Sequence, residues 1–384
     1  MRDDWQAGGF GIYVHWPFCQ SKCPYCDFNS HVAAAVDQRA WARAFVSELR
    51  RYARETPQRI VNSIFFGGGT PSLMDPALIE TLIACIAEHW PLARDVEITL
   101  EANPTSIELG KFKDFRAAGV NRVSVGIQAL NDNDLRRLGR LHSTAEALHA
   151  IEIARAVFLR SSFDLIYARQ DQSLSAWEAE LSQALALDLD HLSVYQLTIE
   201  PDTAFGRLHQ AHRLPGLPSD DLAADMYQLT QDLCKSANLP AYEVSNHARP
   251  WAQARHNLLY WRSGDYIGIG PGAHGRLTVD DTRYSIDTDL SPDIWLEKAT
   301  RGNAEHSRVP LDTADRVTEF VMMGLRLSEG LDLLRLKQMG GALIEEKVAN
   351  LVDLGLVTRS ESHLTVSAHG RMVLNSITRE LLVD

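Results

Sequence analysis

The segment FCQSKCPYCDFNSH (residues 18–31) is the most informative part of the chain, because it crowds three cysteines into one short stretch. They are Cys19, Cys23 and Cys26, and position 28, where a fourth nearby thiol would be expected, is Phe28. Thiolates are metal ligands, and three of them on one loop can converge on a single metal centre. The segment therefore predicts a metal site with three protein ligands.

Metal sites differ in how many protein ligands they need. A structural zinc site usually takes four ligands in two separated pairs, and the remaining cysteines, Cys85 and Cys234, are isolated, although His15 or His31 could complete such a site. An iron–sulfur cube is usually held by four cysteines, so three leave one iron open, as a catalytic metal site requires. We favour such a cluster over a zinc site, a redox pair or a chance grouping of cysteines.

The composition of the chain limits the cellular compartments and the classes of partner that can be expected. The 384 residues carry a net charge of -12, which argues against nucleic acid or an anionic membrane surface as the main partner. No apolar run is long enough to cross a bilayer, and the N-terminus lacks the basic start and apolar run of a signal peptide. Five cysteines do not form a secreted disulfide framework. The sequence predicts a cytoplasmic protein without an integral membrane segment.

Strand-like and helix-like segments alternate through the first half of the chain. The β-branched and aromatic runs lie at 11–16, 63–67, 96–101, 122–127, 162–167 and 191–197. Segments of helical periodicity separate them, such as Trp41, Phe45 and Leu49, which are spaced four apart. This alternation predicts an α/β fold with a parallel sheet, either a partial barrel or an open sheet.

The rhythm of the sequence changes twice, which predicts three parts. We expect a (β/α) part over residues 1–205, a connector over 206–300 and a C-terminal helical domain over 301–384. The last part shows helical segments followed by a small hairpin, which is typical of a winged-helix-like domain.

The pattern Cys19-x-x-x-Cys23-x-x-Cys26, with Tyr25 before the last cysteine, resembles the cluster loop of the radical SAM enzymes. The resemblance implies a partial (β/α)6 barrel and a 4Fe–4S cluster on the three cysteines. It also implies that the amino and carboxylate groups of S-adenosylmethionine occupy the open iron. Reduction then cleaves the sulfonium to a 5′-deoxyadenosyl radical.

Further residues follow the ends of the expected strands, where the chemistry of (β/α) barrels gathers. The glycines at 67–69 let backbone groups approach a small ligand closely, and with Thr70 and Pro71 they resemble the family motif that contacts the amino end of the cofactor. In isolation, each of these residues would be part of a tight turn or a solvated polar side chain. The cofactor contacts that the resemblance implies are Tyr13, Tyr25, Phe28, Gly68, Gly69, Thr70, Glu101, Gln128, Arg140 and Asp164.

Longer motifs resemble the coproporphyrinogen III dehydrogenase-like group of that superfamily. They are YVHWPFC (13–19), FFGGGTPS (65–72), EANP (101–104), RVSVGIQ (122–128), HLSVYQLTIEP (191–201) and YWRSGDYIGIGPGAHG (260–275). The dehydrogenases carry a fourth cysteine two residues after the third and an N-terminal arm. Here position 28 is Phe28 and only 18 residues precede Cys19, which favours the sister group, the HemW-type heme chaperones.

The hallmark of that sister group is H-N-x-x-Y-W, present as HNLLYW (256–261). The resemblance implies that the protein binds heme and passes it to client hemoproteins, respiratory enzymes among them. It is also compatible with transient association of the protein with a membrane. His256, in a flexible connector, is the expected heme ligand beside Tyr260 and Trp261. The alternative is that Leu258 and its neighbours simply pack the connector while His256 is exposed.

Two other functions and one irregularity stay open at this point. The runner-up function is oxidative decarboxylation of coproporphyrinogen III propionates to vinyl groups, and a third is that of a radical SAM methyltransferase, so the sequence leaves open whether the protein is an enzyme. The irregularity is the segment Ala168–Asp171, which replaces the Gly-x-Pro-like turn usual after the fifth strand.

Overall fold

The strands expected in the first half of the chain all form, and they lie side by side in chain order. They are β1 (Phe10–Trp16), β4 (Val61–Gly68), β5 (Leu92–Ala102), β6 (Arg122–Gln128), β7 (Arg160–Tyr167) and β8 (His191–Gln196). Each pairs in parallel with the next. The structure is a computed structural model that describes residues 4–105 and 109–382. It confirms the α/β class, because parallel neighbours need a crossover and the crossovers here are helical.

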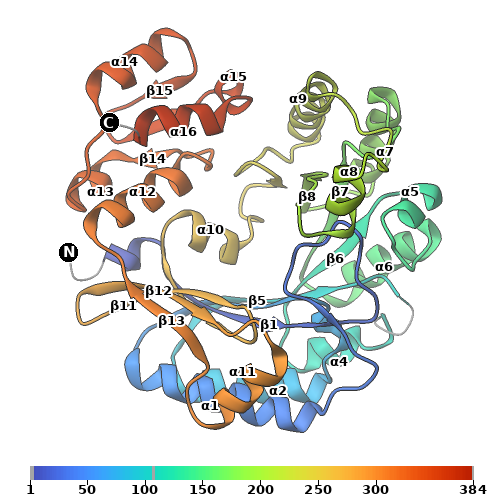
Figure 1. Cartoon of the computed structure of the whole chain (residues 1–384), viewed down its shortest axis with the longest axis vertical. Helices are drawn as coiled ribbons and strands as arrows, with labels where there is room; N and C mark the ends of the chain where they lie inside the picture. The colour runs from blue at the N-terminus through green and yellow to red at the C-terminus, as the bar shows by residue number, and fades with distance from the viewer. Residues whose placement is uncertain (1–3, 106–108, 383–384) are drawn as a thin grey trace.

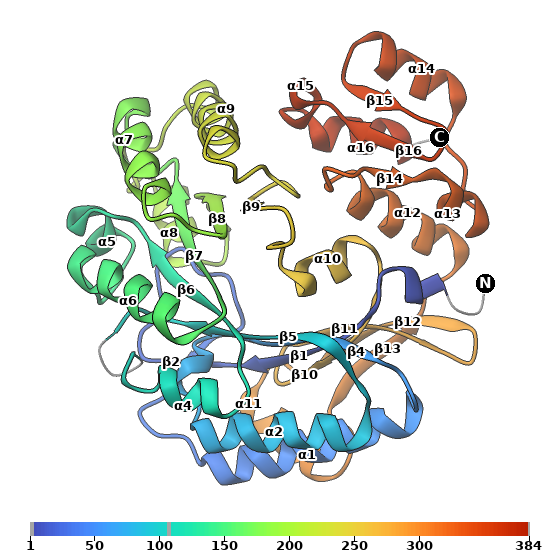
Figure 2. The ribbon, with the colours of Figure 1, turned by 180° about the vertical axis from the view of Figure 1, so that it is seen from behind.

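Helices cover the outer face of this curved sheet, as Figure 2 shows for α1 and α2 beneath β1 and β4. The helices of the crossovers are α1 (Gln38–Glu55), α2 (Pro76–His89), α4 (Phe112–Ala117), α5 (Asp132–Arg137), α6 (Thr144–Val157) and α7 (Leu174–Leu185). Helix α1 begins where the Asp37 carboxylate accepts hydrogen bonds from two backbone N–H groups, and it buries Trp41, Phe45 and Leu49. The four-residue spacing read from the sequence is therefore the core-facing stripe of this helix.

The sheet continues into the segment expected to be a connector. Strand β10 (Asp265–Ile269) pairs in parallel with β1, and β11 (His274–Val279), β12 (Thr282–Thr288) and β13 (Glu305–Pro310) follow as antiparallel neighbours. At the opposite edge, β9 (Asn246–Ala248) pairs with β8. The order β13-β12-β11-β10-β1-β4-β5-β6-β7-β8-β9 makes one 11-stranded sheet. The division at residues 205 and 300 stays a prediction, but the sheet itself crosses it.

The remaining helices of the middle segment lie near the β8 edge, inside the curve of the sheet and, for the last of them, on its outer face. They are α8 (Ala204–Gln210) and α9 (Asp220–Ser236) near β8, α10 (Arg255–Trp261) against β4, and α11 (Pro292–Thr300) against α1. In Figure 1, α10 lies between the sheet and the C-terminal domain. In the described part of the chain, no helix is both long and apolar enough to cross a membrane.

The C-terminal domain has its own core around a small antiparallel sheet. Its elements are α12 (Thr313–Gly324), β14 (Leu331–Asp332), α13 (Leu333–Gln338), α14 (Glu345–Asp353), β15 (Val357–Arg359), β16 (His363–Val366), α15 (Ala368–Arg371) and α16 (Leu374–Leu382). The strands lie in the order β14-β16-β15. Phe320, Leu336 and Leu364 are among the buried side chains that join the helices to this sheet. Helices with a small hairpin are the arrangement that the sequence predicts.

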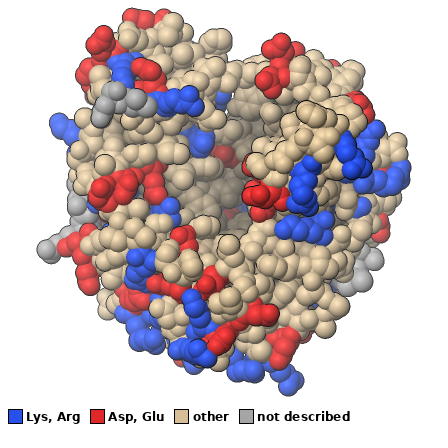
Figure 3. Space-filling model, in the orientation of Figure 1, with Lys and Arg blue, Asp and Glu red and all other residues tan. Residues whose placement is uncertain are grey.

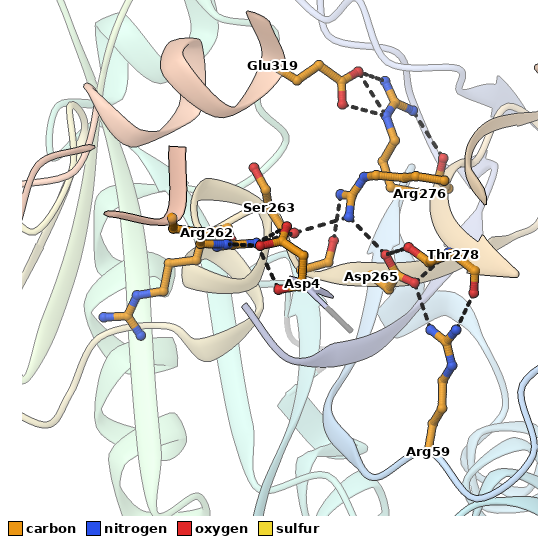
Figure 4. Close-up of polar contacts among 12 residues, drawn as sticks. Asp4, Arg59, Arg262, Ser263, Asp265, Arg276, Thr278 and Glu319 are labelled. Atoms are coloured by element: carbon orange, nitrogen blue, oxygen red, sulfur yellow. Dashed lines mark hydrogen bonds and ion pairs between the residues drawn. The ribbon is translucent and has the colours of Figure 1, made fainter. Parts of the chain in front are cut away.

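Ion pairs hold one side of this domain against the large sheet (Figure 4). Arg276 of β11 contacts both carboxylate oxygens of Glu319 in α12, at 2.8–3.2 Å. Arg335 of α13 contacts both carboxylate oxygens of Asp4, at 2.8 and 2.9 Å, and donates to the carbonyl oxygen of Ser263 at 3.3 Å. On the other side of the domain, residues of α15 and α16 line a cavity together with the end of β8.

Candidate functional site

A cavity of about 160 Å³ lies at the carboxyl ends of the parallel strands, and we call it the cysteine cavity. It is the place where a (β/α) barrel brings residues from different strands together. Nearly all the site residues expected from the sequence line it: Cys19, Cys23, Tyr25, Cys26, Phe28, Gly68, Gly69, Thr70, Glu101, Gln128, Arg140 and Asp164. Tyr13 and His256 do not.

The cysteine loop is held against the strand ends by specific hydrogen bonds. Its ends pair through the short strands β2 (Phe18–Cys19) and β3 (His31–Val32). Thr70 Oγ1 donates to Cys19 Sγ at 3.4 Å, and Arg140 Nη1 donates to Cys23 Sγ at 3.4 Å. Burial raises the pKa of the Cys19 and Cys26 thiols. These thiols therefore favour the neutral form until a cation such as iron stabilises the thiolate.

The glycine run at the end of β4 allows this strand to pack closely on the cysteine loop. Gly68 has a φ of +114°, a conformation that a side chain would strain. A Cβ on Gly69 would lie 2.8 Å from the Phe18 carbonyl oxygen and 3.0 Å from Cys19 Sγ. The glycines thus bring the backbone of β4 to the edge of the cavity, as the sequence predicts.

Two carboxyl groups face the cavity in an environment that favours their protonated forms. Burial, with a smaller contribution from the charge of Asp164, raises the pKa of Glu101 to about 8. Burial also raises the pKa of Asp164 to about 6. The Gly68 N–H donates to Glu101 at 3.2 Å, and the Ser124 hydroxyl donates to Asp164 at 3.4 Å. In these protonated forms the carboxyl groups can donate or accept hydrogen bonds, and a cationic ligand would favour their ionised forms.

Arg140 and Gln128 complete the wall of the cysteine cavity. Arg140 Nη2 donates to the Gly126 carbonyl oxygen at 2.7 Å, whereas its Nε is buried and has no hydrogen-bond partner within the described residues. Gln128 has a φ of +71° at the end of β6. Strained backbone of this kind and orphaned buried donors concentrate at binding sites.

The residues present fit an iron–sulfur cluster with a bound amino-acid-like cofactor. Three thiols line one cavity beside an arginine and two carboxyl groups. Over residues 4–105 and 109–382, no three His, Cys, Asp or Glu side chains are grouped as for a single metal ion. A cluster takes each thiolate to a different iron, so it does not need the three thiols to converge on one ion.

Tyr13 lies behind the cavity and supports the cysteine loop. Its hydroxyl is 3.1 Å from Nδ1 of His15, and Nε2 of His15 is 2.9 Å from the carbonyl oxygen of Asn29 in that loop. Asn29 in turn donates to the carbonyl oxygens of Pro271 and Leu290, each at 2.9 Å. The chain from Tyr13 to Asn29 fixes the end of the loop, a role that the sequence did not reveal.

His256 is neither in a flexible connector nor exposed, so both expectations about its position were wrong. It lies in α10 with 1% of its surface exposed, and its ring stacks on Phe65 of β4. Nδ1 is 2.8 Å from Ser63 Oγ, and Nε2 is 2.5 Å from the Tyr260 hydroxyl. Burial lowers its pKa to about 3. Both ring nitrogens are engaged, because the motif packs α10 against β4.

The irregular segment after β7 is stabilised by a buried arginine that sequence reasoning missed. Ala168 takes the positive φ of +58° that a glycine would otherwise provide. Arg169 is 4% exposed and forms ion pairs with Glu180 and, at 3.0 Å, with Asp134. Its Nη1 donates to the Ile166 carbonyl oxygen at 2.7 Å. The partners of Arg169 lie in α7 and α5, so the sequence next to Arg169 gives no sign of this role.

Comparisons with known proteins agree with the motifs. Residues 13–181 match the Radical SAM superfamily model, and residues 311–373 match the HemN C-terminal domain model. The heme chaperone HemW of Escherichia coli (strain K12) is 38% identical over 379 residues, which cover 97% of this chain and 98% of that protein. The mitochondrial radical S-adenosyl methionine domain-containing protein 1 of Bos taurus is 38% identical over 384 residues, with coverages of 97% and 87%.

The fold has a solved counterpart. The structure of coproporphyrinogen III oxidase (HemN) from Escherichia coli superposes with a TM-score of 0.81 at 24% identity and covers 98% of this chain and 92% of that chain. At this identity the likeness concerns the fold alone. The resemblance read from the cysteine loop, the strand-end motifs and HNLLYW is confirmed by the similarity over nearly the full length, and the chain belongs to the HemW family of the radical SAM superfamily.

Proposed function

We propose that this protein is a heme chaperone of the cytosol, which binds heme and passes it to client hemoproteins. We further propose that it carries a 4Fe–4S cluster on Cys19, Cys23 and Cys26, with S-adenosylmethionine at the open iron. The observation that carries the proposal is the content of the cysteine cavity: three thiols, two carboxyl groups and an arginine, with Phe28 in place of a fourth thiol. Relatives named heme chaperones, 36–38% identical over 97% of this chain, support the heme part.

The residues of the cavity have distinct proposed tasks. When bound, the cluster and S-adenosylmethionine supply one-electron chemistry. The Gly68–Gly69 backbone receives the amino end of the cofactor, and Glu101 and Gln128, with Arg140, contact its ribose and carboxylate. Arg140 offers its free Nε to a carboxylate, since a guanidinium matches that group.

Ligation of heme by His256 stays a prediction and requires a rearrangement. In the folded protein, Nε2 is engaged by the Tyr260 hydroxyl and Nδ1 by Ser63. Iron can reach Nε2 once Tyr260 turns away. Clients of respiratory type and transient contact with a membrane also remain proposals, supported only by the family.

Two incubations of the anaerobically reconstituted protein test the function. With hemin, we expect a stable Soret band. With coproporphyrinogen III, S-adenosylmethionine and a reductant, we expect no protoporphyrinogen, because Phe28 leaves no fourth thiol near the cluster. Multiple-turnover formation of protoporphyrinogen would instead assign the protein as a dehydrogenase.

A pair of cysteine variants tests the cluster. Cys23→Ala should abolish the brown chromophore of reconstituted protein, because an iron loses its thiolate. Cys85→Ala is the matched control, since Cys85 lies in α2 away from the cavity, and it should keep the chromophore. A full, stable cluster in Cys23→Ala would contradict the assignment.

A further inference from the structure

A second cavity, of about 710 Å³, lies between the barrel and the C-terminal domain, and we call it the interdomain cavity. Its walls come from the end of β8, from α9, from residues 243–245, from the ends of α10 and α12, and from residues 371–376. Figure 3 shows the molecule hollowed on this face between the C-terminal domain and the β8 side. The volume is within the range of pockets that hold cofactors, which is about 300–1,000 Å³.

Several apolar and aromatic side chains on the walls of the interdomain cavity are exposed to solvent. Tyr195 is 41% exposed, Met372 39% and Val373 42%, and all three line the cavity together with Trp261. Exposed apolar groups that gather in a concave surface indicate a ligand with an apolar face. Aromatic rings at such a site suit a flat, conjugated ligand, which they can stack against.

The same cavity holds two arginines, Arg326 and Arg371, whose guanidinium groups form no ion pair with a carboxylate within the described residues. Arg326 forms no hydrogen bond or ion pair through its guanidinium within the described residues, and it lies over the Trp261 ring at 5.9 Å. Arg371 donates from Nη1 to the Arg326 carbonyl oxygen at 2.7 Å and from Nη2 to the Leu327 carbonyl oxygen at 2.9 Å. Backbone carbonyls fix Arg371 in place but leave its positive charge available to an anion.

Among the described residues, the acidic side chains of the lining form no ion pair with these arginines, although the charge of Glu243 partly offsets the lowering of the Arg371 pKa by burial. Glu243 is 1% exposed and its carboxylate accepts hydrogen bonds from the Asn246 side chain and the Ser245 N–H. Burial raises the pKa of Glu243, so its charge is disfavoured. Asp220 is exposed in the first turn of α9. The cavity therefore combines apolar and polar wall segments with two guanidinium groups, each suited to a carboxylate.

The interdomain cavity lies next to the cysteine cavity. Tyr195 and Asp164 stand on the paired strands β8 and β7, where Ser193 is opposite Asp164 and Tyr195 opposite Ile166. Burial is the main cause that raises the pKa of the Tyr195 phenol, and the charge of Asp164 is the next largest cause. The two groups are therefore close. Asp164 lines one cavity and Tyr195 the other. A ligand in the interdomain cavity would thus be adjacent to the cofactor site.

We propose that the interdomain cavity is the seat of a flat apolar macrocycle with two carboxylates, a porphyrin such as heme, whose propionates bind Arg326 and Arg371. The macrocycle packs between Trp261, Tyr195 and the Met372–Val373 turn. This inference rests on the proposed heme-binding function and deepens it by giving the ligand a place. Recognition through carboxylates does not require iron, which separates this site from any axial ligand.

The test compares ligands and variants in anaerobic titrations followed by absorbance and tryptophan fluorescence. The ligands are hemin, metal-free protoporphyrin IX and protoporphyrin IX dimethyl ester. We expect the unmodified protein to bind hemin and protoporphyrin IX, and to bind the dimethyl ester at least tenfold more weakly. Arg326→Glu should weaken both diacids at least tenfold and leave the ester unaffected, because Arg326 makes no contact on which the fold depends.

The matched control is Arg359→Gln, which removes an exposed arginine of the same domain that pairs with Glu345. It should leave all three affinities unchanged, and both variants should keep the cluster chromophore. Unchanged affinity of Arg326→Glu for hemin and protoporphyrin IX, or equal binding of acid and ester, would overturn the site while leaving the heme function intact. If hemin binds tightly and protoporphyrin IX not at all, iron alone directs binding and the site is also overturned. Absence of hemin binding to the unmodified protein would overturn the function itself.

Discussion

Arg169 shows at the scale of a single residue how the fold stabilises the irregular segment Ala168–Asp171 after β7. Its guanidinium is 4% exposed and pairs with Glu180, which is 9% exposed and also accepts from the Leu130 N–H at 2.6 Å. A buried ion pair adds little net stability, but removal of one partner leaves the other charge uncompensated. The loop, α5 and α7 therefore depend on one side chain.

We expect Arg169→Met to lower the free energy of unfolding by about 3–5 kcal/mol, because Glu180 would then be buried without a counter-charge. Arg137→Met is the matched control. Arg137 pairs with Asp171 in the same loop, but the two side chains are 49% and 65% exposed, so its loss should cost less than about 1 kcal/mol. Chemical denaturation measures both values, and equal costs would show that the Arg169 pair is not buried in solution.

Glu101 makes a second residue-scale prediction, which concerns pH. Its pKa is raised from 4.5 to about 8 in the folded protein, so between these values the folded state holds a proton that the unfolded state has lost. The free energy of unfolding therefore falls as pH rises through this window, by up to about 1.4 kcal/mol per pH unit. Glu101→Gln should remove that slope from the cofactor-free protein.

The measurement is chemical denaturation at pH 6.5 and at pH 8, above the pKa of about 6 of Asp164. The difference between variant and unmodified protein isolates Glu101 from the other titrating groups. Parallel pH dependence in the two proteins would mean that Glu101 is already ionised at pH 6.5.

At the scale of elements, α10 is a short helix locked against β4 through one histidine. His256 bonds to Ser63 below it and to Tyr260 one turn further along the helix, and it stacks on Phe65. The helix also presents Trp261 to the interdomain cavity. The motif HNLLYW therefore has a packing role in the folded protein, and any heme ligation by His256 must compete with the hydrogen bond to Tyr260.

This competition gives a prediction that involves two variants. If His256 binds iron through Nε2, Tyr260→Phe should raise the affinity for hemin, because it removes the competing hydroxyl. His256→Ala should lower that affinity and shift the Soret maximum, at a cost in stability of about 1–3 kcal/mol for the lost buried hydrogen bonds. Titrations in which both variants match the unmodified protein in affinity and spectrum would leave His256 with packing alone.

At the scale of the whole molecule, several kinds of contact join the C-terminal domain to the rest of the chain. Besides ion pairs, the Ser328 N–H donates to the Tyr242 carbonyl oxygen at 2.9 Å, and Val244 packs against the core of the domain. Arg276–Glu319 and Arg335–Asp4 join it to β11 and to the N-terminal segment, while α15 and α16 face β8 across the interdomain cavity. Ion pairs and hydrogen bonds account for part of this attachment, while the interdomain cavity separates the facing surfaces of the two parts.

We expect Arg335→Met to loosen this attachment and to lower stability by about 1–3 kcal/mol, because Asp4 and the Ser263 carbonyl lose their partner. Hydrogen exchange should quicken in α12, α13 and α16 and stay unchanged in β4–β6. Arg359→Gln, which breaks an exposed pair on the outer side of the same domain, is the control and should alter neither region. Uniform quickening over the whole chain would contradict a separable domain.

The sequence by itself determined the parallel strands, the cysteine loop and most residues of the cysteine cavity. Each of these is a local pattern: β-branched runs, a fixed cysteine spacing, or a polar residue that follows a strand. Once the strands are parallel, geometry gathers their carboxyl ends, so Glu101, Gln128 and Asp164 meet without any further information.

Only the tertiary structure decided the rest, because it depends on contacts between residues far apart in the chain. The pairing of β10 with β1 joins residues about 250 positions apart and leaves no periodic signal in either segment. The burial of His256 follows from Ser63 and Phe65, and the role of Arg169 from Glu180 and Asp134. The interdomain cavity likewise exists only between surfaces that the chain brings together when the C-terminal domain docks on the sheet.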